Sequence, residues 1–118
     1  MSRATIHRGD LYWVDWHPAR GSEQARRRPA LIVQTDAGNR QTKYPNTVIV
    51  AVTSAPARVP THLEVVPSEE NGLRNTSTIK CEQVLTISKE RLDGYIGRLD
   101  AEIMQSVDEA IKRVFGLS

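Results

Sequence analysis

The spacing of hydrophobic positions changes once along the chain, near residue 100. Before that point, apolar residues gather in short runs separated by Gly, Pro and Asn, which is typical of strands joined by turns. The predicted strands lie at residues 10–16, 29–34, 46–53, 61–66, 78–87 and 94–97. The run at 78–87 fits one bent strand or a pair of strands. The dense apolar runs at 29–34 and 46–53 predict strands that are buried on both faces or inside a barrel.

After residue 100 the hydrophobic period becomes helical. Apolar residues recur at positions i, i+4, i+7, i+8 and i+11 of one helix face. They are Ile103, Val107, Ala110, Ile111 and Val114. Asp100 is placed to cap the helix N-terminus, and Gly116 is placed to cap its C-terminus. The pattern as a whole predicts a mainly β (α+β) fold, in which a small, strongly bent antiparallel sheet or barrel is closed by one amphipathic helix.

Length and composition narrow the class of protein. The chain has 118 residues, of which 39% are hydrophobic and 25% charged, so we expect one folded domain over residues 1–118. The longest apolar run, Val48–Val52, is far too short to span a membrane, and charged residues interrupt the first 20 positions. The single cysteine excludes an internal disulfide, and the three histidines lack metal-ligand spacing. These features predict a cytoplasmic protein without a metal or cofactor.

The charge is divided unevenly along the chain. Residues 1–58 contain nine Lys and Arg against four Asp and Glu, a balance of +5, whereas residues 59–118 contain seven against ten, a balance of −3. Twelve of the 16 basic residues are Arg, whose forked guanidinium suits phosphate contacts. An Arg-rich codon usage would produce the same bias without any function. The functional interpretation is a basic surface that binds something anionic.

The loop between the first two predicted strands, residues 17–29, concentrates this charge. It contains four Arg together with Glu23 and the flexible Gly21. Loops on a rigid sheet are where sites commonly lie, so the arginines could bind a phosphodiester backbone. The alternative is a solvated basic turn.

Short motifs follow one another in a characteristic order along nearly the whole chain. They are RGDLYWVD at 8–15, Pro18, GSEQ at 21–24, RP at 28–29, LIVQ at 31–34, TVIVAVTS at 47–54, PTH at 60–62, CEQ at 81–83, TI at 86–87 and RL at 91–92. This ordered set resembles the MazF/PemK toxins, which are the endoribonuclease halves of type II toxin–antitoxin pairs.

The resemblance implies a fold, an activity and partners. The fold would be an SH3-like barrel of about five to seven short antiparallel strands with a C-terminal helix. The activity would be sequence-specific cleavage of single-stranded RNA without a metal, in which the 2′-OH attacks to leave a 2′,3′-cyclic phosphate and a 5′-OH. The partners would be a second copy of the chain and a MazE-like antitoxin with an acidic, flexible tail.

By the same resemblance, Arg28 and Thr53 are the central catalytic positions. A guanidinium offers fixed charge and forked donors to the phosphoryl oxygens, and a hydroxyl can donate to the same group. Because a guanidinium has a pKa above about 12, it is a poor general base. Glu82, which follows a basic residue two positions earlier at Lys80, and Glu23 are better proton acceptors. We take Glu82 as the first candidate and Glu23 as the second.

Other polar residues of the matched motifs are expected to bind RNA. They are Arg20, Ser22, Gln24, Arg26, Arg27, Ser54, Lys80 and Gln83. Some members of the family have a histidine at the position of Ser22, so an acid–base histidine is not available there. The pair Arg26 and Arg27 should strengthen backbone binding and its dependence on salt.

Several residues have two interpretations. Tyr12, Trp13 and Trp16 could stack on bases, although alternating aromatics more often divide between core and interface. We expect Cys81 to be a buried apolar residue and His62 to pack or hydrogen-bond in its strand. The same fold could also serve a non-enzymatic gyrase poison or an inactive nucleic-acid-binding module. The presence of both Arg28 and Thr53 favours the nuclease over these two alternatives.

Overall fold

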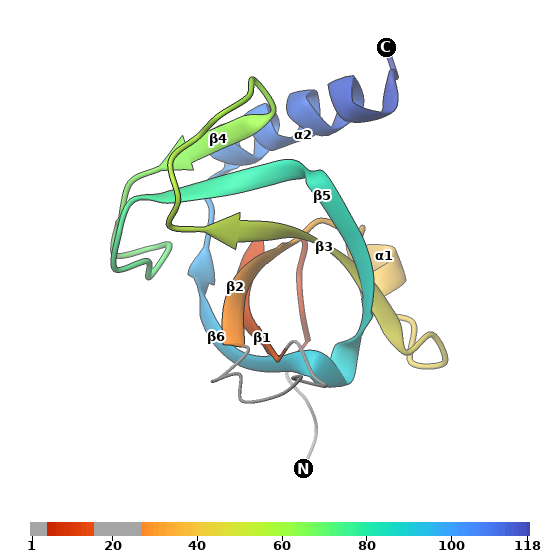
Figure 1. Ribbon diagram of the computed structural model, residues 1–118. Coiled ribbons are helices and arrows are strands. Elements are labelled where there is room, and N and C mark those ends of the chain that lie inside the picture. Colours follow the sequence, from red (N-terminus) through yellow and green to blue (C-terminus); the bar gives the residue numbers. More distant parts are fainter. Residues whose placement is uncertain (1–4, 16–26) are drawn as a thin grey trace, which may run out of the picture.

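Short strands account for most of the chain before residue 100 in the computed structural model, which describes residues 5–15 and 27–118 (Figure 1). The strands are β1 (Asp10–Asp15), β2 (Arg27–Ile32), β3 (Asn46–Thr53), β4 (His62–Val65), β5 (Ser77–Ser88) and β6 (Leu92–Arg98). The helical elements are α1 (Asp36–Asn39), the 3-10 turn η1 (Lys89–Arg91) and α2 (Ala101–Phe115). The predicted strands and the terminal helix are confirmed, whereas α1 and η1 were not predicted.

The strand β2 begins two residues earlier than predicted and also ends two residues earlier. Arg27 and Arg28 pair with the end of β1, so the ladder extends into the basic segment. At the other end, the backbone N–H groups of Val33 and Gln34 both donate to the carbonyl of Val48, which ends regular pairing. The hydrophobic pattern identified the buried part of the strand but not the hydrogen-bonded part.

The six strands form one antiparallel sheet in the order β4-β5-β3-β2-β1-β6. The sheet bends round into a ring-like shape (Figure 1), but β4 and β6 are its edges and do not pair with each other. The predicted mainly β fold with a C-terminal helix is therefore confirmed, and the sheet is not closed into a barrel by pairing.

A bulge makes β5 a single bent strand. Val84 pairs with Val50 of β3, but the next partner, Ala51, pairs with Lys80, so residues 81–83 have no counterpart on β3. Extra residues on one strand bend and twist it locally. This bend carries Cys81, Glu82 and Gln83 round the corner of the sheet.

The sheet separates two apolar clusters, because successive side chains of a strand face opposite sides. Leu31, Val50 and Ile79 belong to the cluster that packs under α2, whereas Ala30 and Ile49 belong to the cluster inside the ring. All five side chains are completely buried. The prediction that the strands at 29–34 and 46–53 are buried on both faces is thus confirmed.

The helix α2 covers one face of the sheet and has the predicted caps. The Asp100 carboxylate accepts a hydrogen bond of 2.8 Å from the Ile103 N–H, and Gly116 ends the helix in the left-handed region with φ +70°. Val107 and Ala110 are buried against the sheet, as predicted, together with Met104.

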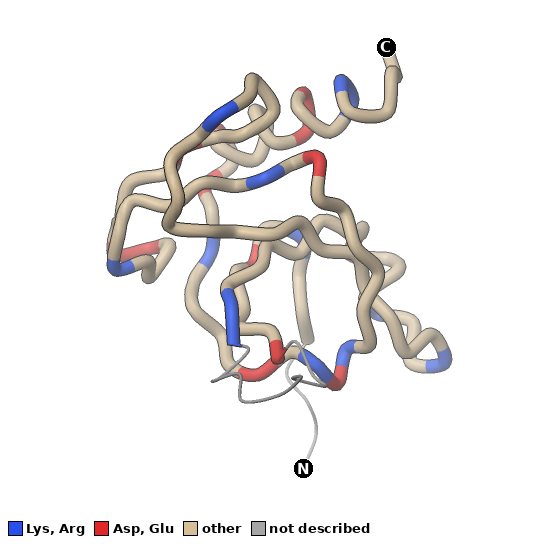
Figure 2. The backbone as a smooth tube through the Cα atoms, viewed as in Figure 1, with Lys and Arg blue, Asp and Glu red and all other residues tan. Residues whose placement is uncertain are grey.

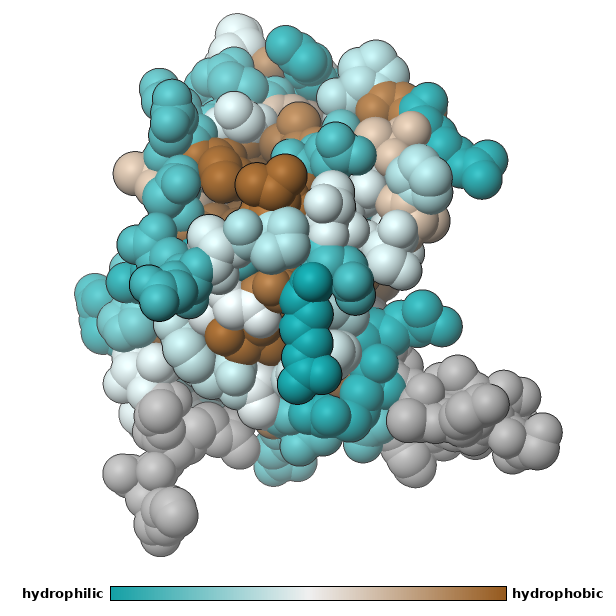
Figure 3. Space-filling model, turned by 90° about the vertical axis from the view of Figure 1, so that its left-hand side faces the viewer, coloured by the Kyte–Doolittle hydropathy of each residue, from teal (hydrophilic) through white to brown (hydrophobic). Residues whose placement is uncertain are grey.

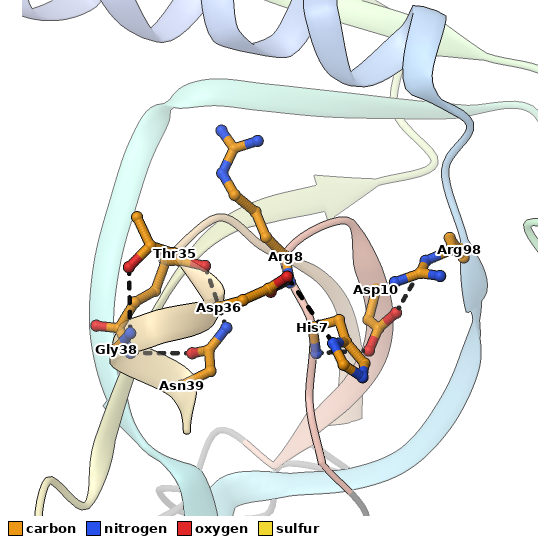
Figure 4. Close-up of polar contacts among 9 residues, drawn as sticks. His7, Arg8, Asp10, Thr35, Asp36, Gly38, Asn39 and Arg98 are labelled. Atoms are coloured by element: carbon orange, nitrogen blue, oxygen red, sulfur yellow. Dashed lines mark hydrogen bonds and ion pairs between the residues drawn. The ribbon is translucent and has the colours of Figure 1, made fainter. Parts of the chain in front are cut away.

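The motif residues Arg8 and Asp10 hold the first segment in place (Figure 4). The Arg8 backbone N–H donates to the carboxylate of Asp36, and its guanidinium forms an ion pair with Asp108 of α2. The buried carboxylate of Asp10 lies 3.4 Å from Nε of Arg98 on β6. These motif positions therefore stabilise the fold and lie away from the site described below.

Candidate active site

Arg28 and Thr53 meet because β2 and β3 run antiparallel in a fixed register. Ala30 pairs with Ala51, so continuing this register by two residues places Arg28 opposite Thr53, on the same face of the sheet. Both side chains line the same two neighbouring cavities. The two positions that the resemblance marked as catalytic are therefore brought together by strand pairing.

The two cavities share the wall formed by Arg28, Val52 and Thr53. The smaller cavity has a volume of about 280 Å³, and Lys80, Gln83 and Leu85 complete its lining together with Ala51. The larger cavity has a volume of about 620 Å³ and lies towards β6 and the segment before β5. Arg28 and Thr53 are therefore accessible from both sides.

The polar groups of this wall are available to a ligand. The side chain of Arg28 is exposed and makes no hydrogen bond or ion pair within residues 5–15 and 27–118. The Thr53 hydroxyl oxygen accepts a hydrogen bond of 3.2 Å from the Ala55 N–H, which leaves its own hydrogen free to donate. The wall thus presents a fixed positive charge and a hydroxyl donor side by side.

Glu82 lies in a different setting, at the bend of β5. Its Oε2 is 2.8 Å from Nε2 of His62 on β4, and its Oε1 is 3.5 Å from the Thr61 hydroxyl. The other ring nitrogen of His62 accepts a hydrogen bond of 3.1 Å from the Arg58 N–H. Since a backbone N–H can only donate, Nδ1 carries no proton and Nε2–H donates to the carboxylate. The prediction that His62 hydrogen-bonds in its strand is confirmed.

This setting keeps Glu82 ionised. Partial burial raises the pKa of the carboxyl. The hydrogen bond from His62, a backbone hydrogen bond and the positive charge of Lys80 together lower it by more, so the resulting pKa lies below the ordinary 4.5. Glu82 does not line either cavity that contains Arg28, whereas its neighbours Lys80 and Gln83 line the smaller one.

Cys81 is buried beneath the same bend, as predicted. Its side chain is completely enclosed, and burial together with the charge of Glu82 raises the pKa of the thiol from 9.0 to about 11. A thiol that remains protonated and enclosed is not a nucleophile.

The remaining predicted RNA-binding residues are placed unequally. Ser54 and Arg27 line the larger cavity, and Lys80 and Gln83 line the smaller one. The Arg27 guanidinium already donates to the Asp93 carboxylate at 2.9 Å and lies 4.9 Å from the ring centroid of Trp13. The other predicted residues lie outside the described parts of the chain. They are Arg20, Ser22, Glu23, Gln24, Arg26 and the aromatic Trp16.

Several residues that line the larger cavity were not predicted from the sequence. Tyr95 of β6 and Arg74, Asn75 and Ser77 before or at the start of β5 all line it. Their surroundings in the sequence give only weak signals, because Asn71-Gly72 is merely typical of a turn and the predicted strand at 94–97 is short. Long-range packing, which the local pattern does not encode, brings the two segments to one cavity.

Positions of Lys and Arg and positions of Asp and Glu both occur along much of the described backbone (Figure 2). Within the part of the chain that the structure describes, no three His, Cys, Asp or Glu residues are grouped closely enough to hold a metal ion. The described helices include none with the length and apolar character needed to cross a bilayer.

Comparisons with known proteins identify similar sequences and structures. The sequence model of a family described as PemK-like, MazF-like toxin of type II toxin-antitoxin system matches residues 7–115. The chain is 41% identical to Endoribonuclease EndoA of Bacillus subtilis over 109 residues, 91% of each chain. It resembles the structure of an endoribonuclease in complex with its cognate antitoxin from Mycobacterial species, with 26% identity, a TM-score of 0.77 and 98% of both chains covered. It also has the fold of MazF from Deinococcus radiodurans, with 22% identity, a TM-score of 0.76, and coverage of 98% of this chain and 100% of that one.

Proposed function

The chain belongs to the family of PemK-like and MazF-like toxins of type II toxin–antitoxin systems, and from this premise we propose that it is a metal-independent endoribonuclease of single-stranded RNA. The observation that carries the proposal is that Arg28 and Thr53 both line the wall shared by the two cavities. A scissile phosphate bound at this wall meets both donors, with room for RNA on either side.

The proposed reaction needs no group beyond those of the protein and the RNA. The ribose 2′-OH loses its proton to a base, its oxygen forms a bond to the adjacent phosphorus, and the bond from phosphorus to the 5′-oxygen breaks. The leaving 5′-oxygen then gains a proton from a general acid, for which Arg28 is the candidate. The products are a 2′,3′-cyclic phosphate and a 5′-OH. Arg28 and Thr53 donate to the phosphoryl oxygens, where negative charge develops.

Glu82 is our first candidate for the base and Glu23 our second. The hydrogen bond from His62 keeps Glu82 ionised, and a base must be ionised to accept a proton. Its neighbour Lys80 lines the smaller cavity beside Thr53 and can attract the phosphate towards this corner. A bound phosphate adds negative charge, which raises the carboxyl pKa and makes Glu82 a stronger base.

We further propose that the protein acts in the cytoplasm as a homodimer and is neutralised by a MazE-like antitoxin. The relative from Mycobacterial species was solved with its cognate antitoxin, which supports a partner of this kind. An acidic, flexible tail would satisfy the unpaired guanidinium of Arg28 and exclude RNA from the wall.

The test is to incubate the protein with a mixed-sequence RNA in EDTA and to map the ends of the fragments. We expect cleavage at a short sequence, with 2′,3′-cyclic phosphate and 5′-OH ends. A 2′-deoxy substitution at the nucleotide before the scissile phosphate should abolish cleavage there, since the nucleophile is gone. Absence of cleavage by the folded protein would refute the proposal and leave a non-enzymatic toxin or an inactive binding module.

Thr53 offers a second test of the site. Thr53→Ala removes a hydrogen bond to a charged group, which is worth about 1.5–3 kcal/mol, so kcat/KM should fall about 10- to 100-fold. Thr53→Ser retains the hydroxyl and should keep most of the activity. Equal losses in the two variants would show that the hydroxyl is not the group that matters.

A further inference from the structure

The larger cavity has features of a nucleotide-binding site that the activity alone does not require. It lies on the side of the molecule that carries the end of β3, the strand β6 and the segment between β4 and β5. Figure 3 faces this side and shows apolar surface lying between hydrophilic side chains. Its volume of about 620 Å³ is within the range of small-molecule sites and exceeds the roughly 300 Å³ at the lower end of that range.

Two aromatic rings stand in this cavity. Tyr95 is 60% exposed, yet its ring is held by an edge-to-face contact with the buried Tyr12, with 5.5 Å between centroids. Trp13 is half-buried and has Arg27 against its ring. A large apolar ring that is fixed on one side and exposed on the other is a platform for an unstacked base.

Polar groups complete the cavity. Arg74 is exposed and makes no hydrogen bond or ion pair with any other residue in the described parts of the chain, so its guanidinium is open to a phosphate. The amide of Asn75 and the hydroxyl of Ser54 can both donate to and accept from the edge of a base. The ring, the cation and the hydrogen-bonding groups thus match the face of a base, a phosphate and the edge of a base.

The backbone fixes these groups relative to one another. The buried side chain of Asn71 ties its turn by accepting from the N–H groups of Ser68 and Leu73. A Cβ on Gly72 would lie 2.1 Å from the carbonyl oxygen of Ile96, and one on Gly97 would lie 2.3 Å from that of Asn71. Only glycines allow so close an approach, which sets the segment carrying Arg74 directly against β6 and Tyr95.

We infer that the larger cavity is a nucleotide subsite in which Tyr95 stacks on a base and Arg74 binds the phosphate next to it. This inference rests on the proposed function, since the RNA must cross the wall of Arg28 and Thr53 to reach the cavity. Nucleotides on opposite sides of the scissile phosphate then occupy different cavities. Tyr95 and Arg74 therefore determine sequence preference and affinity on one side only.

The experiment compares sequence profiles of cleavage for the wild type, Tyr95→Ala and Tyr95→Phe on one randomised RNA pool. In Tyr95→Ala we expect preference at a position on one side of the cut to be relaxed, and kcat/KM on the best sequence to fall about 10- to 100-fold. Tyr95→Phe keeps the ring and should keep the profile. An unchanged profile in Tyr95→Ala would overturn the inference, provided that the wild type cleaves. If the wild type does not cleave, it is the proposed function that fails.

Arg74 is tested by binding rather than by cleavage. Arg74→Gln should raise the Kd for an RNA with a 2′-deoxy scissile nucleotide. It should also reduce the slope of log Kd against log salt by about 0.7, which corresponds to the loss of one phosphate contact. Arg113→Gln, at the end of α2 outside both cavities, removes the same charge and should change neither. Equal effects of the two variants would show that Arg74 acts only through the overall charge of the protein, and would overturn its role in binding a phosphate in the cavity. Dissociation of a dimer by Tyr95→Ala, measured by sedimentation, would instead assign Tyr95 to a contact between copies and overturn its role in stacking.

Discussion

The wall between the cavities and the bend of β5 both carry polar side chains, but these differ in whether the protein itself supplies their partners. At the wall, the Arg28 guanidinium is exposed and unpaired within the described residues, and the Thr53 hydroxyl has a hydrogen left to donate. At the bend, the carboxylate of Glu82 is held by His62, whose side chain is only 6% exposed. The first region is solvated and ready for a ligand, and the second is satisfied by the protein itself.

This difference corresponds to the two needs of the proposed reaction. Groups that stabilise developing charge must be free to bind the phosphate. Because they are exposed, water solvates them at little cost before the phosphate binds. A base must be in the right ionisation state beforehand, and donors such as the Nε2–H of His62 secure that state. The following changes separate the two regions by their effects, from the largest to the smallest.

Arg28→Ala should have the largest effect on catalysis. Removing one preorganised donor of charge stabilisation costs about 10²- to 10³-fold in rate, so kcat/KM should fall by this factor. Thermal unfolding should be unchanged, because the side chain is exposed and makes no hydrogen bond or ion pair among the described residues. Arg28→Lys keeps the charge but not the fork and should be intermediate. Normal cleavage by Arg28→Ala would contradict the proposed role of Arg28 in stabilising charge on the scissile phosphate.

Glu82→Gln tests whether the bend takes part in catalysis. A general base contributes at least about 10²-fold, so kcat should fall by about this factor at neutral pH. Glu64→Gln, an exposed carboxylate on β4 outside both cavities, is the matched control and should be active. If Glu82→Gln is fully active and Glu23→Gln is not, the bend is structural and the base is Glu23.

His62→Phe should act through Glu82. The change removes the donor that lowers the carboxyl pKa, so the acidic limb of the kcat/KM profile should move to higher pH. It also removes the acceptor of the exposed Arg58 N–H, and the loss of this hydrogen bond should destabilise the protein by about 0.5–1.5 kcal/mol in urea unfolding. A destabilised variant with an unmoved pH profile would contradict the link between His62 and the base.

These two regions also differ in how far the sequence could predict them. The opposition of Arg28 and Thr53 follows from two apolar runs that pair antiparallel, once their register is known. The contact of His62 with Glu82 depends on the unpaired residues 81–83, and the hydrophobic pattern only allowed a bent strand there. The alternation of apolar and polar residues indicates which face of the sheet a side chain occupies. A bulge shifts the side chains to the other face, and the amino-acid composition of the strand does not reveal it.

The larger cavity was the least predictable part. Gly72 and Gly97 allow a turn and a distant strand to contact each other, and this close approach brings Arg74 and Tyr95 to the same cavity. Nothing local in the sequence signals a contact between segments more than twenty residues apart. By contrast, the caps of α2 at Asp100 and Gly116 were predictable, because capping depends on residues within one turn of the helix end.

Stability against pH should show a small contribution of the bend. The pKa of Glu82 is lower in the folded state than its ordinary 4.5, so its charge stabilises the fold above about pH 4.5 and ceases to do so as the pH falls through the lowered value. Because the carboxylate is 36% exposed, solvent screens it and the gain stays below about 1 kcal/mol. The wild type should exceed Glu82→Gln by this margin at pH 7 and converge with it in acid. A difference that grows in acid would contradict the sign.

Cys81 should show the smallest effect of all. The enclosed thiol has a pKa of about 11, so an alkylating reagent at pH 8 meets almost no thiolate and no open path to the sulfur. Mass spectrometry should find the native protein unmodified and the urea-unfolded protein fully alkylated, with RNA cleavage unaffected by treatment of the native form. Rapid alkylation of the native protein would mean that the bend of β5 opens, and the hydrogen bond from His62 could then not hold Glu82 in a fixed state either.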